Sequence, residues 1–244
     1  IFILYKMNIY NYLITGGAGF IGINLCKRIL EQTNDNIIVI DNLNTNHSNE
    51  IFKLEKDYKD RLLLIIEDIC NLNLDYYNKL LVKRHKILKI NYIFHLACNA
   101  SPKSYQKEPL KTLDTCYNGT KNILDIAKLN NSRIIYASTS EIYGNPKVSE
   151  QEESYFGNVN TIGDRSCYDE GKRIGETLCY EYKKLNVNIG IVRIFNTYGP
   201  YMSANDGRVI SNFITQTLNN ENITIYGDGM QTRSFCYIDD LING

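Results

Sequence analysis

The sequence lacks an excess of charge of either sign, because 27 lysines and arginines balance 27 aspartates and glutamates. A nucleic acid or an anionic membrane surface would need a basic field on the protein. Long apolar runs are absent too. None approaches the roughly 20 residues that span a bilayer, and the short apolar stretch that opens the chain does not resemble a signal peptide. We therefore expect no nucleic-acid partner and no membrane partner.

Paired cysteines are also missing. The sequence has seven cysteines, an odd number, and no two of them form a Cys-x-x-Cys pair. This spacing argues against a disulfide framework and against a structural zinc site, so we expect no metal. Such cysteines are typical of reduced thiols in the cytosol, and we expect a cytoplasmic location.

What the sequence does contain is an alternation of short apolar runs and helical stretches. A first strand is expected at residues 8–15, and runs typical of parallel strands buried on both faces follow at 37–40, 62–66, 92–96, 134–137 and 189–194. Candidate helices lie at about 20–31, 109–129 and 166–186, and residues 71–90 are predicted to form an exposed helical excursion. The alternation predicts an α/β fold, a doubly wound parallel sheet of the Rossmann type.

A glycine-rich segment, Thr15 to Gly22, connects the first strand to the first helix. In a dinucleotide site Gly16 would permit the tight turn, Gly19 would let the backbone approach a pyrophosphate, and Gly22 would let the helix pack closely on the strand. The phosphates would then lie at the helix N terminus, where free N–H groups favour negative charge. Taken alone, the segment could equally be an ordinary glycine turn.

Asp41, at the end of the second strand, favours the dinucleotide site. It follows Gly22 by 19 residues, a spacing at which a carboxylate hydrogen bonds ribose hydroxyls and repels a 2′-phosphate. The cofactor is therefore predicted to be NAD rather than NADP. Asp68 is placed to meet the adenine region, or is an ordinary solvated loop carboxylate. The residues expected at the cofactor site are Gly16, Gly19, Phe20, Ile21, Gly22, Asp41, Asn42, Asp68, Ile69, Leu96, Ala137, Tyr168, Lys172 and Thr197.

A reductase of this architecture needs a phenolate base whose pKa a nearby ammonium lowers, which Tyr and Lys at i, i+4 on a helix provide. Four Tyr-x-x-x-Lys pairs occur, beginning at Tyr117, Tyr143, Tyr168 and Tyr180. The first contains a glycine, and the second lies in a loop that contains a proline. The fourth lies about 18 Å farther along the helix than the third. Since sites of this fold lie at the carboxyl edge of the sheet, we expect Tyr168 with Lys172 to be catalytic.

The fifth strand ends at the same edge with Ser138, Thr139, Ser140 and Glu141. Thr139 could hydrogen bond both a substrate hydroxyl and the Tyr168 oxygen. Three hydroxyl residues at a strand end are otherwise an ordinary turn signal. Thr139, Tyr168 and Lys172 together form a coherent redox triad.

These segments resemble the extended short-chain dehydrogenase/reductase family, and within it the UDP-glucuronic acid decarboxylases, also called UDP-xylose synthases. The resemblance covers residues from about 8 to 244 and rests on Thr15 to Gly22, Ala137 to Gly144, Cys167 to Arg173, Phe195 to Pro200, Asn205 to Arg208 and Gly227 to Phe235. Ser140 and Glu141 favour this subfamily, because 4,6-dehydratases usually carry Asp-Glu there and 4-epimerases usually lack the acid. A UDP-uronate 4-epimerase, a sugar-nucleotide 4,6-dehydratase and a non-catalytic NAD-binding module remain the alternatives.

The resemblance implies a carboxy-lyase with tightly bound NAD that converts UDP-glucuronate to UDP-xylose through a 4-keto intermediate. Tyr168, held ionised by Lys172, would take the proton of the C4 hydroxyl. Thr139 would orient the ketone, and Ser140 and Glu141 would act near C5. A UDP-sugar substrate and a homodimer are the expected partners. The residues that match substrate-binding positions are Asn196, Arg208 and Arg233.

The sequence also departs from the family. Asp114 and Cys116 stand where relatives usually carry Lys and Asn, and a cysteine cannot replace the hydrogen bonds with which that Asn braces the active-site helix. We expect an NAD-binding domain over residues 1–196 and the start of a nucleotide-sugar-binding region over 197–244. Relatives continue beyond this point with an Arg thought to contact the substrate carboxylate, so we expect a truncated chain with little activity.

Overall fold

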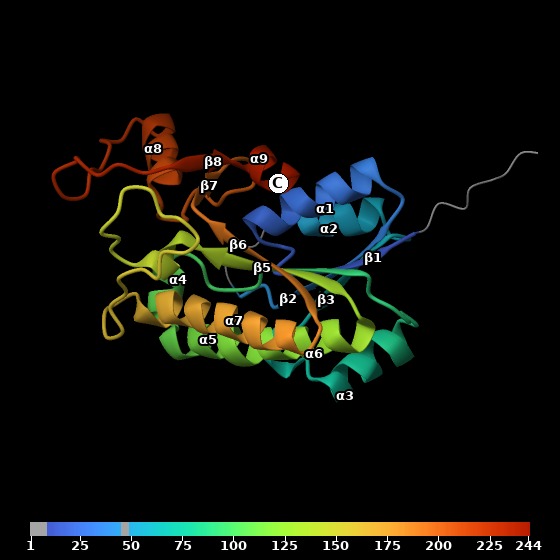
Figure 1. Ribbon diagram of the computed structural model, residues 1–244. Coiled ribbons are helices and arrows are strands. Elements are labelled where there is room, and N and C mark those ends of the chain that lie inside the picture. Colours follow the sequence, from blue (N-terminus) through green and yellow to red (C-terminus); the bar gives the residue numbers. More distant parts are fainter. Residues whose placement is uncertain (1–8, 45–48) are drawn as a thin grey trace, which may run out of the picture.

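The computed structural model describes residues 9–44 and 49–244 (Figure 1). Six parallel strands form its main sheet, in the order β3-β2-β1-β4-β5-β6. They are β1 Asn11–Thr15, β2 Asn36–Asp41, β3 Leu62–Ile66, β4 Tyr92–His95, β5 Arg133–Thr139 and β6 Asn188–Ile194. This order reverses direction between β1 and β4, which confirms the doubly wound Rossmann-type sheet.

Helices cover both faces of the sheet (Figure 1). One face carries α1 Phe20–Gln32 and α2 Glu50–Asp57. The other carries α3 Leu74–Tyr77, α5 Pro109–Asp114, α6 Thr120–Asn130 and α7 Ser166–Lys184. The π-helical segments η2 Asn78–Arg84 and η3 Thr115–Gly119 extend α3 and join α5 to α6. Short elements complete this part: η1 Ile69–Asn71, α4 Pro102–Lys107 and η4 Ser140–Tyr143.

The last part of the chain packs beside α1 (Figure 1). It contains a two-stranded parallel sheet, β7 Asn196–Tyr198 with β8 Phe235–Tyr237, and the helices α8 Val209–Leu218 and α9 Ile238–Asn243. Hydrogen bonds link α1 to it, including one of 2.7 Å from Lys27 Nζ to the Tyr201 hydroxyl. The division into domains at residue 196 stays a prediction.

The predicted strands agree with the structure to within a few residues. The first strand begins at Asn11 rather than at residue 8, which lies outside the described residues. His95 ends β4 and is buried between the Thr15 hydroxyl, 2.7 Å from Nδ1, and the Thr120 hydroxyl, 3.0 Å from Nε2. No helix among the described residues has the length and apolar character needed to cross a bilayer.

The prediction that residues 71–90 form an exposed excursion was wrong. The segment is helical, but Leu72, Tyr77, Leu81 and Ile90 are fully buried and belong to the core on the α6 side of the sheet. The segment's many lysines and asparagines suggested exposure, yet they lie on its outer side while the apolar residues between them pack inward.

Candidate active site

The carboxyl ends of the strands open into one large cleft of about 1730 Å³. Its lining includes the segments that follow β1 and β4, the ends of β2 and β5, the first turns of α7, and residues within 194–210 and 232–235. Every residue that the sequence assigned to cofactor, substrate or catalysis lines this cleft. The fold thus brings together side chains that lie up to 217 positions apart, from Gly16 to Arg233.

The glycine turn after β1 fits a diphosphate. Gly16 has φ +71°, and a Cβ there would lie 2.8 Å from the Ala97 nitrogen, so only glycine can make this turn. A Cβ on Gly22 would lie 2.5 Å from the Gly16 oxygen, which shows how closely the helix meets the turn. Gly19 faces more open space, and among the described residues no side chain caps α1. The first-turn amides of α1 can therefore receive an anion.

Asp41 is held at the cleft by the backbone. Its Oδ2 accepts a hydrogen bond of 3.0 Å from the Ala18 amide, and its Oδ1 accepts one of 2.9 Å from the Leu43 amide. Each carboxylate oxygen can accept further bonds. The carboxylate is thereby fixed beside the glycine turn, in an orientation suited to ribose hydroxyls.

Asp68 belongs to an ion-pair cluster rather than to a solvated loop. It accepts hydrogen bonds from Lys111 Nζ at 2.8 Å, from the Cys70 amide at 2.9 Å and from Asn42 Nδ2 at 3.1 Å. Burial raises the pKa of the Asp68 carboxyl, but these bonds outweigh it and lower the pKa to about 2. Lys111 was not predicted from the sequence, because nothing in the pattern of α5 shows that this helix reaches the loop after β3.

Tyr168 lies in the first turn of α7 and is buried, with its ring stacked on Tyr105 at 5.0 Å between centroids. Lys172 lies one turn farther, and its ammonium donates a hydrogen bond of 2.7 Å to the carbonyl of Ala137. Burial raises the pKa of Tyr168 above its usual range, while a hydrogen bond with Thr139 opposes this. The expected lowering of the Tyr168 pKa by Lys172 is therefore not found. The Lys172 ammonium is bonded to the Ala137 carbonyl in β5, and burial dominates at the Tyr168 phenol.

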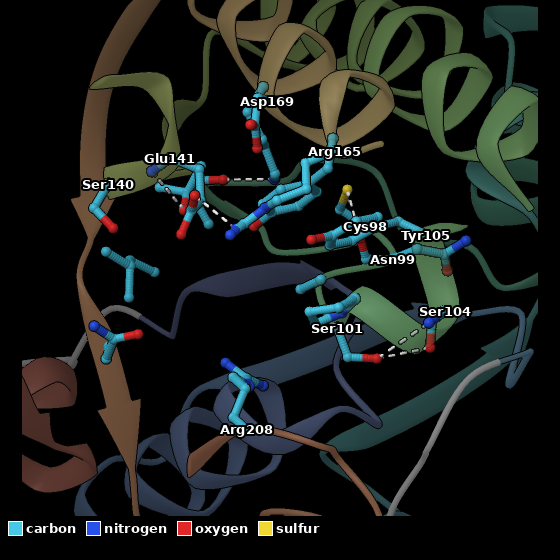
Figure 2. Close-up of a pocket in the computed structure, with 18 of the residues that line it drawn as sticks. Cys98, Asn99, Ser101, Ser104, Tyr105, Ser140, Glu141, Arg165, Asp169 and Arg208 are labelled. Carbon is cyan, nitrogen blue, oxygen red and sulfur yellow. Dashed lines mark hydrogen bonds and ion pairs between the residues drawn. The ribbon is translucent and has the colours of Figure 1, made fainter. Parts of the chain in front are cut away.

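Beyond β5, η4 places Ser140 and Glu141 at the mouth of the site. The Glu141 amide donates to the Thr139 hydroxyl at 3.2 Å, which orients the strand end. Figure 2 shows the Arg165 side chain extending toward Glu141, with which it forms an ion pair of 2.6 Å. Asp169 is buried beside them, and one of its oxygens has no partner among the described residues.

Arg165, Asp169 and Tyr105 are site residues that the sequence reasoning missed. Burial raises the pKa of Asp169 to about 6, against the opposing effect of Arg165. Arg165 precedes Tyr168 by three residues, so its position one helical turn from the predicted base is the signal that could have found it. Asp169 follows Tyr168 directly, and its only signal is its place within the segment Cys167 to Arg173. No comparable signal marks Tyr105, which comes from α4.

The residues expected at the substrate end lie on the opposite wall. Arg208 is paired with Asp206, through a bond of 3.0 Å from Nη2 to Oδ1 among others, and Figure 2 shows it across the cleft from Glu141. Asn196 Nδ2 donates to the Ser234 carbonyl at 3.3 Å. The Arg233 guanidinium, which is exposed, donates to the Thr232 carbonyl at 2.7 Å. Their contacts with a substrate stay predictions.

Asp114 and Cys116, the two residues that depart from the family's usual Lys and Asn, both make contacts near the site. Asp114 lies 3.8 Å from Lys111, so it joins the ion pairs near Asp68. Cys116 lies in η3 with its Sγ 3.4 Å from the Sγ of Cys98. It also packs on α7, because a Cβ placed on Gly171 would lie 3.0 Å from the Cys116 sulfur.

A doubly wound sheet with a glycine turn after β1 and a Tyr-Lys pair beside the end of β5 defines a dinucleotide-binding protein of the short-chain dehydrogenase/reductase type. The chain belongs to the NAD dependent epimerase/dehydratase family, whose sequence model matches residues 12–244. This family membership agrees with the NAD predicted from Asp41.

Among curated proteins, this chain is similar to UDP-glucuronic acid decarboxylases. The chain is 46% identical to UDP-glucuronic acid decarboxylase 5 of Arabidopsis thaliana over 95% of this chain and 64% of that protein. It is 44% identical to UDP-glucuronic acid decarboxylase 1 of Xenopus tropicalis over 95% of this chain and 52% of that protein. The chain thus spans between about half and two thirds of the length of these relatives.

Solved structures share the fold. UDP-glucuronic acid 4-epimerase from Bacillus cereus, in complex with UDP-glucuronic acid and NAD, is 30% identical with a TM-score of 0.78, over 95% of this chain and 70% of that one. UDP-N-acetylglucosamine 4-epimerase from Methanobrevibacter ruminantium is 28% identical with a TM-score of 0.81, over 97% and 72% of the two chains.

Proposed function

We propose that the protein to which this chain belongs decarboxylates UDP-glucuronate to UDP-xylose with NAD as a catalytic cofactor. The observation that carries the proposal is the meeting of Thr139, Glu141 and Tyr168 at one end of the cleft whose other end holds the glycine turn and Asp41. Similarity to the UDP-glucuronic acid decarboxylases of Arabidopsis thaliana and Xenopus tropicalis supports decarboxylation as the reaction.

NAD would be held along the carboxyl edge of β1, β2 and β3. Gly16, Gly19 and the first-turn amides of α1 would bind the diphosphate, and Asp41 would bind the adenosine ribose. The Asn42–Asp68 pair would border the adenine. When bound there, NAD supplies an acceptor for the C4 hydride and later the donor that returns it.

The chain's own residues would handle protons and orientation. In its ionised form, which the nearby Lys172 ammonium would favour against the effect of burial, Tyr168 would accept the proton of the C4 hydroxyl, and Thr139 would hold the oxygen that becomes the ketone. With a ketone at C4, the C5 carboxylate is that of a β-keto acid. The bond from C5 to the carboxylate carbon then breaks, CO2 leaves, and its electron pair becomes the enolate that is protonated at C5. Ser140 and Glu141 would act near that carbon.

The remaining wall would hold the nucleotide part of the substrate. A guanidinium pairs well with a diphosphate, so Arg208 and Arg233 are suited to the UDP phosphates, and Asn196 to the sugar nucleotide. Arg165 lies on the catalytic side, 2.6 Å from Glu141, where it can neutralise the carboxylates gathered around the sugar.

A homodimer would form through the surface of α5, η3 and α7. These elements expose apolar side chains that a monomer of this fold would leave in water. They are Leu110, Leu113, Tyr117, Ile174 and Tyr180.

Product analysis tests the proposed reaction. The chain and a version extended at its C-terminal end by the matching segment of the Arabidopsis relative are incubated with UDP-glucuronate and catalytic NAD, and products are identified by mass spectrometry and NMR. UDP-xylose with release of CO2 supports the proposal. UDP-galacturonate would assign the chain to the 4-epimerases. In a parallel incubation with UDP-glucose, formation of a 6-deoxy-4-keto sugar would assign it to the dehydratases. NAD binding by both versions without turnover would favour a non-catalytic module.

A further inference from the structure

Two cysteine thiols meet at the floor of the cleft. Cys98 follows β4 in the loop that lines the cleft, and Cys116 lies in η3 behind it. Their sulfurs are 3.4 Å apart, although the residues are 18 positions apart in the chain. All seven cysteines lie in the described part of the chain, and none of them is joined there in a disulfide.

The two thiols differ in access and in acidity. Cys98 is half-buried and lines the cleft, whereas Cys116 is buried. The hydrogen bond with Cys116 lowers the pKa of Cys98 to about 7, against the effect of burial and with the help of the Lys172 ammonium. The pKa of Cys116 is raised by the same hydrogen bond and by burial. Cys98 is therefore the more acidic and more accessible thiol, and Cys116 is the thiol next to it.

We propose that Cys98 and Cys116 form an oxidation site, a dithiol that a peroxide converts into a disulfide beneath the cofactor cleft. The Cys98 thiolate attacks a peroxide oxygen, the O–O bond breaks, and Cys98 becomes a sulfenic acid with release of hydroxide. The Cys116 thiol then attacks the sulfenic sulfur, the S–O bond breaks, and water leaves. Two thiols are oxidised to one disulfide while hydrogen peroxide is reduced to two water molecules.

The cross-link would act on the active-site helix. A disulfide has sulfurs about 2.05 Å apart, so the two sulfurs must approach each other from their separation in the reduced protein. Cys116 packs on Gly171, the residue before Lys172, and Cys98 lies in the wall of the cleft. Closing the bond draws η3 and the loop after β4 together, which changes the packing of Cys116 on α7 and the wall of the cleft at Cys98. Oxidation should therefore weaken NAD binding, and a reductant should restore it.

The test treats the purified chain with hydrogen peroxide and maps its peptides without reduction. The expected result is one peptide pair joining Cys98 to Cys116, lighter than the sum of its parts by ~2 Da for the two hydrogens lost. Saturating NAD should slow the reaction, since Cys98 lines the cofactor cleft. Dithiothreitol should reverse both the cross-link and a several-fold loss of NAD affinity. This readout needs no decarboxylase activity, so it stands apart from the proposed reaction.

Variants separate the pair from the other cysteines. Cys98→Ser and Cys116→Ser should each abolish the cross-link and the peroxide sensitivity of NAD binding, and the control Cys236→Ser in β8 should preserve both. Over-oxidation of Cys98 in the wild-type chain without a cross-link would overturn the proposal. So would a cross-link that leaves NAD affinity unchanged.

Discussion

Among single residues, Asp41 is expected to control the choice of dinucleotide. Its carboxylate is fixed by two backbone amides and would face the position of a 2′-phosphate. The neutral Asp41→Asn removes a like-charge repulsion and should shift the ratio of NADPH to NADH affinity by about tenfold toward NADPH. Fluorescence titration with the two reduced cofactors measures the ratio. An equal ratio in Asp41→Asn and in wild type would contradict this role, and the exposed Asp57→Asn is the control.

The protonation state of Asp169, at the candidate active site, is expected to affect the stability of the fold. Its folded pKa, about 6, lies above the ordinary value of 3.8, because burial disfavours its charged form. The free energy of unfolding therefore contains the full stabilising contribution of the protonated Asp169 carboxyl below pH 3.8. This contribution is lost as the pH rises through 6. Asp169→Asn removes this loss and should raise the free energy of unfolding at pH 8 by on the order of 2 kcal/mol.

Denaturant titrations at several pH values check this prediction. The gain from Asp169→Asn should shrink as the pH is lowered from 8 to 4, and the exposed Asp164→Asn should change stability by less than about 0.5 kcal/mol. A gain that is constant across the range would show that Asp169 is not the titrating group.

At the scale of elements, the segment formed by α3 and η2 is a structural part of the core. Leu81 is 0% exposed there, whereas Leu88, four residues beyond the end of η2, is 84% exposed. Leu81→Ala should lower the free energy of unfolding by about 2–5 kcal/mol, because it leaves a cavity. Leu88→Ala should cost less than about 0.5 kcal/mol, as expected at an exposed site. Similar small losses in both variants would contradict the burial of this segment.

The sequence predicts the sheet well, because each parallel strand is a short apolar run that needs no partner to be identified. It predicts the α3–η2 segment less well, because the lysines and asparagines between its buried residues dominate its composition. For the site, motifs identify Gly16, Asp41 and Tyr168. Lys111 and Tyr105 reach the cleft only through the packing of α5 and α4, which no local pattern reveals.

At the scale of the whole molecule, the exposed apolar surface of α5, η3 and α7 predicts association. Ile174, in the middle of α7, is 41% exposed, and a charge there should prevent two copies from packing together. Ile174→Glu is expected to be a monomer by light scattering when the wild type is a dimer. Leu218→Glu on α8, at a position 77% exposed, is the control and should leave the dimer intact. A wild-type monomer would contradict the proposed assembly.

The proposed reaction depends on a transient oxidation at C4 with Tyr168 as the base. UDP-glucuronate deuterated at C4 is supplied to the extended chain with unlabelled NAD, and the UDP-xylose formed is analysed by NMR. Deuterium is expected to stay on C4, because the hydride that leaves also returns. Tyr168→Phe should lower the rate by about 10²–10⁴-fold while still binding NAD. Loss of the label, or an undiminished rate in Tyr168→Phe, would contradict the proposed reaction.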